Sequence, residues 1–156
     1  MKLLRSLAFA SIGLVVLSCR DSTAPHPAAG YYVLESVNGQ PLPAAILVPI
    51  PEDTYNILSG YLALDDDSDN GLTAELRRES LYNNPREIHY TSTFDYRTDG
   101  ATIELFPHCD ETAFCGSIEG VFVGSTIVLT IALSSDQSVT YHYRRAEPPE
   151  NWSPGL

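Results

Sequence analysis

Apolar and polar residues alternate along most of this chain, which is the period of a β-strand that buries one face. The alternation is plainest in three stretches, 87–97, 125–134 and 138–145. Turn sequences such as Asn38-Gly39 and Asp99-Gly100 separate such stretches, and they readily adopt the positive φ angles of tight hairpins. Taken together, the alternating segments predict eight or nine strands near residues 31–37, 44–50, 57–65, 72–79, 87–97, 101–107, 117–123, 125–134 and 138–145.

Two of these segments leave an alternative open. Prolines at 43, 49 and 51 remove ladder donors from the 44–50 segment. The spacing of Leu72 and Leu76 also suits a short helix over 72–82. Short connections favour antiparallel neighbours, and closure of a long meander removes exposed sheet edges. The sequence therefore predicts an all-β fold, an antiparallel up-and-down meander that closes into a barrel of about eight strands over residues 30–145.

The amino terminus predicts a cellular address. Lys2 and Arg5 precede an apolar run that ends at Leu17, which is typical of a secretory signal and too short for a comfortable membrane span. The run Val16-Leu17-Ser18-Cys19 resembles the lipobox of bacterial lipoproteins. This resemblance implies cleavage after residue 18 and a lipid anchor on Cys19; the alternative is a plain signal peptide. Arg20, rather than Asp, follows the cysteine, and by resemblance to enterobacterial sorting rules this favours the outer membrane over the inner membrane.

Charge and composition complete this organisation. Residues 19–29 are small and proline-containing, as in a flexible tether, and residues 146–156 form a proline-rich tail. The chain has 9 basic and 20 acidic residues, and loss of the first two basic residues with the signal leaves 7 against 20, a net charge of −13. This acidity disfavours nucleic acid as a partner, because phosphate contacts need a cationic surface. We expect a protein of the bacterial cell envelope, lipid-anchored to the outer membrane and facing the periplasm.

A second resemblance concerns the fold. The run from Gly30 to Pro43, GYYVLESVNGQPLP, resembles the opening strand and turn of small bacterial lipocalin-like lipoprotein domains, and Val139–Arg145 suits their terminal strand. The resemblance covers residues 30–145 and implies an up-and-down barrel of about eight strands. Most members that it resembles have no assigned activity, so it implies a fold and not a function.

Cysteine and acidic residues offer two further sites. With Cys19 acylated, Cys109 and Cys115 remain as an even pair, which predicts one disulfide in an oxidising envelope. A metal site with His108 is the rival interpretation, but the cysteine spacing fits no standard zinc pattern. The segment Asp65–Gly71 has alternating aspartates like a calcium loop, yet it lacks the closing carboxylate, so we expect a solvated hairpin tip, with weak calcium binding as the alternative.

The candidate binding residues are aromatic. They share the predicted inward phase of their strands: Tyr90, Phe94, Tyr96, Tyr141 and Tyr143. They line a cavity for a small apolar ligand, or they fill the barrel as core. His89 and His142 lie on the opposite, polar phase. No catalytic motif or cofactor motif is present, so we expect a non-catalytic protein that binds an apolar ligand inside the barrel. The alternative is a protein-interaction or inhibitor module of the periplasm with a filled barrel.

Overall fold

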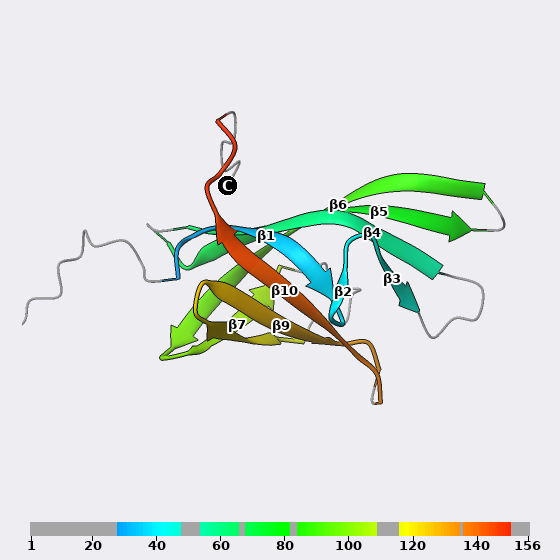
Figure 1. Cartoon of the computed structure of the whole chain (residues 1–156). Helices are drawn as coiled ribbons and strands as arrows, with labels where there is room; N and C mark the ends of the chain where they lie inside the picture. Colours follow the sequence, from blue (N-terminus) through cyan, green and yellow to red (C-terminus); the bar gives the residue numbers. More distant parts are fainter. Residues whose placement is uncertain are drawn as a thin grey trace, which may run out of the picture.

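The computed structural model describes residues 28–47, 54–65, 68–81, 84–108, 116–134 and 136–150, and their regular structure is β (Figure 1). The strands are β1 (Gly30–Val37), β2 (Gln40–Pro41), β3 (Ala44–Leu47), β4 (Thr54–Leu64), β5 (Asn70–Leu81), β6 (Asn84–Asp99), β7 (Thr102–Pro107), β8 (Ile118–Val123), β9 (Thr126–Ala132) and β10 (Ser138–Ala146). The described residues contain no helix long and apolar enough to cross a membrane.

Eight of these strands close into a barrel. From β4 to β10 each strand pairs antiparallel with the next, β10 pairs with β1, and β1 pairs with β4. The closing pair joins Gly30–Val33 to Tyr61–Leu64. The predicted all-β, antiparallel up-and-down barrel is thus confirmed. Two short strands lie at its margin, since β2 pairs with the end of β1 and β3 with the start of β4.

The helical alternative over residues 72–82 is wrong for the described residues, because Asn70–Leu81 is the strand β5. Pairing with two neighbouring strands explains why this segment is a strand and not a helix. Strand β5 pairs with β6 along its whole length, and it pairs with β4 on its other side. Two ladders of backbone hydrogen bonds outweigh the weak helical spacing of two leucines.

Inward-facing side chains form the buried core of the barrel. Strands β5 and β8 contribute glycine at two inward positions, and large neighbours occupy the space. A Cβ atom on Gly71 would lie 2.3 Å from Cε2 of Phe94, and one on Gly120 would lie 2.5 Å from Cδ2 of Leu129. The buried core comprises Ala28, Tyr32, Leu34, Val37, Ala44, Ile46, Ile57, Leu62, Leu64, Phe94, Tyr96, Ile103, Leu105, Ile127, Leu129, Val139, Tyr141 and Tyr143.

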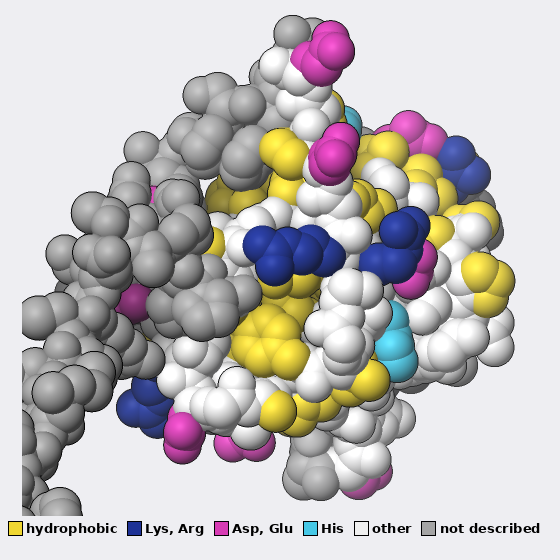
Figure 2. All heavy atoms as spheres, turned by 60° about the vertical axis from the view of Figure 1, so that its left-hand side comes forward, with side chains coloured by type: hydrophobic (Ala, Val, Ile, Leu, Met, Phe, Trp, Pro, Cys, Tyr) yellow, Lys and Arg dark blue, Asp and Glu magenta, His cyan; other side chains and the backbone are white. Residues whose placement is uncertain are grey.

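One end of the barrel, which we call the closed end, is covered by the first described residues. Ala28 and Ala29, the last two residues of the expected tether, are 3% and 5% exposed. The hydroxyl of Tyr32 donates to the carbonyl of Ala28 at 2.8 Å, and Nη2 of Arg145 donates to that of Ala29 at 2.5 Å. Figure 2 views the molecule from the side on which the described chain begins, and there arginine side chains lie directly against apolar atoms.

Candidate functional site

Four of the five candidate aromatic residues belong to the barrel core. Phe94, Tyr96, Tyr141 and Tyr143 are 2–3% exposed. The rings of Tyr141 and Tyr143 lie nearly parallel, with centroids 6.2 Å apart. These four side chains are thus buried within the barrel. The fifth residue, Tyr90, is 40% exposed, because it lies in the part of β6 that precedes the β7 pairing.

A polar cluster faces the barrel interior near Tyr90, at the end opposite to the closed end; we call this the open end. Glu75 and Arg77 lie on the inward face of β5 and form an ion pair, with Nε of Arg77 2.8 Å from Oε2 of Glu75. Their side chains are 10% and 22% exposed, respectively. Gly60 of β4 lies beside this pair, and a Cβ atom there would lie 3.1 Å from Cδ2 of Leu34 and 3.4 Å from Cγ of Glu75.

Two tyrosine rings enclose the Arg77 guanidinium. Its central carbon lies 4.7 Å from the ring centroid of Tyr55 and 4.2 Å from that of Tyr90, which is cation–π distance. The Tyr90 hydroxyl donates to Oε1 of Glu79 at 2.5 Å, so the exposed ring is held in place. Tyr55 and Tyr141 lie close enough for each to influence the pKa of the other. Strands β4, β5, β6 and β10 therefore meet in this cluster.

Burial governs the protonation of these phenols. Burial raises the pKa of Tyr143 and of Tyr141 well above the ordinary value, and the carboxylate of Glu75 raises both further. The pKa of Tyr55 is raised by burial as well. Burial alone lowers the pKa of Arg77, but the charge and hydrogen bond of Glu75 reverse this effect and leave it raised. The accessible groups of the open end are therefore the exposed ring of Tyr90 and the half-buried guanidinium of Arg77, whereas the phenols of Tyr141 and Tyr143 are buried.

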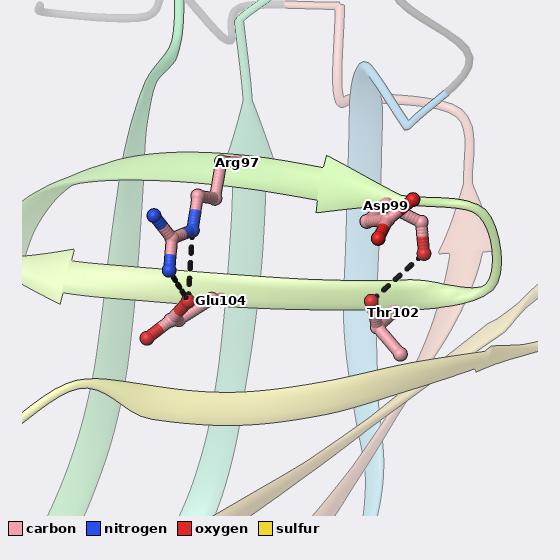
Figure 3. A network of polar contacts seen from close by, with 4 residues as sticks. All are labelled: Arg97, Asp99, Thr102 and Glu104. Carbon is pink, nitrogen blue, oxygen red and sulfur yellow. Dashed lines mark hydrogen bonds and ion pairs between the residues drawn. The ribbon is translucent and has the colours of Figure 1, made fainter.

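The outer face of the barrel carries a hollow of about 590 Å³ over β6 to β9. Its rim includes Arg97, whose Nε and Nη2 donate to Oε2 of Glu104 at 2.8 and 2.5 Å (Figure 3). The hydroxyl of Thr102 donates to the carbonyl of Asp99 at 2.8 Å. Val121 is 43% exposed and lines the hollow with Val128. This outer hollow, named so below, combines an apolar surface with an acidic rim.

A smaller groove of about 360 Å³ lies on the outer face over β1, β4, β5 and β6. The rings of Tyr31 and Tyr61 line it, with centroids 5.2 Å apart, and Val33 beside them is 36% exposed. Both hollows thus lie on the outside of the barrel wall, whereas the candidate aromatic residues, apart from Tyr90, face its packed interior.

The remaining sequence-predicted residues are placed as follows. His89 is exposed and His142 half-buried, both on outward-facing positions, as predicted. At the tip between β4 and β5, Ser68 Oγ donates to Oδ2 of Asp65 at 2.8 Å, while residues 66–67 lie outside the described ranges. Within those ranges no group of three metal-ligating side chains occurs. Cys19, Cys109 and Cys115 also lie outside them, so the lipidation site and the disulfide stay predictions.

The sequence interpretation missed the charged members of the open-end cluster, Glu75, Arg77 and Glu79. Their signal was present, since residues 75, 77 and 79 share one face of a strand over 70–81. The helical alternative for that segment concealed it. No family model and no curated protein matches the chain.

Proposed function

We propose that this chain is a lipid-anchored, non-catalytic lipoprotein of the bacterial cell envelope, with a lipocalin-like barrel that serves as a filled scaffold and an outer face that binds a partner protein. The proposed localisation rests on the lipobox-like run that ends at Cys19. The anchor places the barrel on the outer membrane, facing the periplasm. An anchor that carries more than one acyl chain holds a protein stably on a membrane.

The packed interior is the observation that carries this proposal. Phe94 lies against the backbone of Gly71, and Leu129 lies against that of Gly120, so at these two places a side chain takes up interior space that a carrier would keep for its ligand. The outer hollow, in contrast, exposes Val121 beside the Arg97–Glu104 pair. An exposed apolar surface with a polar rim is typical of a protein-binding site.

The rim indicates the chemistry of the partner. Asp99, Glu104 and Glu119 line the outer hollow against one cation, Arg97. A complementary surface would insert an apolar side chain toward Val121 and place basic groups opposite the carboxylates.

A small apolar ligand at the open end is the second candidate function, and one observation favours it. The Tyr90 ring is 40% exposed beside the half-buried Arg77, so an aromatic face is accessible from solvent there. Such a ligand would stack on Tyr90 at the open end and leave the core residues in place.

Native mass spectrometry of protein purified from the envelope tests both candidates. We expect a partner protein to remain bound to the wild-type chain and to the Tyr90→Ala variant, and to be lost from Val121→Lys. The proposal is wrong if the bound species is a small molecule that survives Val121→Lys and is lost from Tyr90→Ala.

A separate experiment tests the lipid anchor and the membrane localisation. A Cys19→Ser variant should lose its acyl mass and leave the membrane fraction; a variant that still fractionates with membranes contradicts the lipoprotein proposal.

Alkylation of the purified lipoprotein without reductant should leave Cys109 and Cys115 unmodified, as the proposed disulfide requires. Labelling of both thiols would exclude that disulfide.

A further inference from the structure

Strand β6 is longer than its neighbours on one side. Its residues Asn84–Asp95 pair with β5, whereas β7 pairs only with Phe94–Asp99. Beyond that pairing, the amide of His108 donates to the carbonyl of Thr93 at 3.0 Å. Among the described strands, none pairs with Pro85–Ser92 on this side. Figure 1 shows β5 and β6 projecting from the barrel, with β6 outermost.

This stretch of β6, which we call the β6 edge, has the composition of a strand that pairs readily. Residues 88–92 are Ile, His, Tyr, Thr and Ser; none is acidic, lysine or arginine, and all but half-buried Ile88 are exposed. The two charged residues that precede them already have partners within the hairpin. Nη2 of Arg78 lies 2.6 Å from Oε1 of Glu87, and Nη2 of Arg86 lies 3.5 Å from Oε2 of Glu79. Natural edge strands often carry unpaired charges, which prevent them from pairing with another chain. In the β6 edge, Arg86 and Glu87 are both paired within the hairpin.

We propose that the β6 edge pairs antiparallel with the β6 edge of a second copy of the chain, about a twofold axis at Ile88. In this register Glu87 lies opposite His89 of the other copy, and an imidazole N–H can donate to Oε2 of the carboxylate, whose Oε1 contacts Arg78. On the opposite face Arg86 lies opposite Tyr90 of the other copy, where a guanidinium contacts an aromatic ring. Twofold symmetry forms each of these pairs twice.

Neighbouring registers lack this complementarity. An axis at Glu87 would place two like charges directly opposite one another, which is destabilising. An axis at His89 would oppose Glu87 to Thr91 and lose the pairing with the imidazole. Charge complementarity therefore selects both a second copy as the occupant and Ile88 as the centre. The dimer goes beyond the proposed function: it leaves the outer hollow of each copy free and so presents two of them.

Cysteine cross-linking in intact envelopes tests this register. The two Ile88 side chains would be direct neighbours, so an Ile88→Cys variant should form a covalent dimer under mild oxidation, above the wild-type background. Ser92→Cys is the matched control, because each copy of residue 92 would lie four residues from the axis, on opposite sides of it, and the two thiols could not meet. Val123→Cys, 61% exposed on β8, controls for random collision.

A charge exchange tests the pairing itself. Adding His89→Glu to Ile88→Cys opposes two carboxylates and should lower the dimer yield about fivefold. Adding Glu87→His as well recreates the pair in reverse and should restore the yield. Equal cross-linking by Ser92→Cys, no dimer from Ile88→Cys, or no recovery in the exchanged variant would overturn the proposal. A monomer that still binds its partner through Val121 would overturn the dimer alone and leave the proposed function standing.

Discussion

At the scale of single residues, Glu75 of the open end is a charged side chain that is largely buried. Its side chain is nine-tenths buried inside a barrel wall, and Arg77 supplies the compensating charge. A buried ion pair contributes little net stability, but removal of one partner leaves an uncompensated charge. Two tyrosine rings hold the guanidinium in place, so the pair is a fixed part of the wall.

An Arg77→Met variant should therefore lose about 2 kcal/mol of unfolding free energy, somewhat below the usual range because Arg77 retains some exposure. Urea denaturation measures this loss. The matched control is Arg97→Met, which breaks the solvent-exposed pair with Glu104 and should cost much less. Equal losses in the two variants would contradict the buried character of the Glu75–Arg77 pair.

Gly71 is the residue that most directly reports the filled interior. A methyl group at this position would approach Phe94 to 2.3 Å and the carbonyl of Ala63 to 2.9 Å. A Gly71→Ala variant should lose about 1–3 kcal/mol of stability from overpacking. Combining it with Phe94→Leu should cost less than the sum of the two single changes, because the smaller side chain makes room. Strict additivity in urea denaturation would show that the ring does not press on this backbone.

The buried phenols predict a loss of stability at alkaline pH. The pKa values of Tyr141 and Tyr143 are higher in the folded chain than the ordinary value of 10.0. Their contribution is therefore complete below pH 10 and is lost as the pH rises above it, because only the unfolded state then releases the protons readily. Unfolding free energies measured from pH 9 to pH 11 (about one unit on each side of that value) should fall. A Tyr141→Phe variant should fall less steeply; an identical slope would contradict this assignment.

At the scale of elements, β6 combines two environments in one strand. Phe94–Asp99 has strand neighbours on both sides, whereas Pro85–Ser92 has a described neighbour only in β5. The sequence predicted a strand over 87–97, and the structure extends it to Asn84–Asp99. Alternation alone could not show where the β7 pairing begins, because pairing depends on the partner strand and not on the period of β6.

Hydrogen exchange should divide β6 at this point. We expect amides in 85–92 to exchange faster than those in 94–99, since each alternate amide of the first half points to the β6 edge. Tyr96, whose amide donates to the carbonyl of Asp69 at 2.6 Å, serves as the protected reference. Uniform protection along the whole strand would indicate that both halves are covered equally.

At the scale of the whole molecule, the sequence predicted the barrel and much of its core. Turn residues such as Asn38 and Gly39, with φ angles of 51° and 74°, set the hairpins, and strict alternation assigned Phe94, Tyr96, Tyr141 and Tyr143 to the inside. The open-end cluster escaped prediction because Glu75 and Arg77 are polar residues on an inward face. Arg77 packs between the rings of Tyr55 and Tyr90 from two other strands, and no local sequence pattern reveals such contacts.

The proposed scaffold requires a filled barrel, and xenon titration followed by methyl NMR can detect an interior cavity, because xenon binds dry apolar cavities. The interior methyl groups of Ile57, Leu62, Leu105, Ile127 and Leu129 report on the barrel, and those of exposed Val121 and Val123 report on non-specific effects. We predict small, non-saturating shifts at the interior methyl groups, no larger than those at the exposed valines. Saturable shifts concentrated on the interior set would reveal an apolar cavity inside the barrel and contradict the filled scaffold.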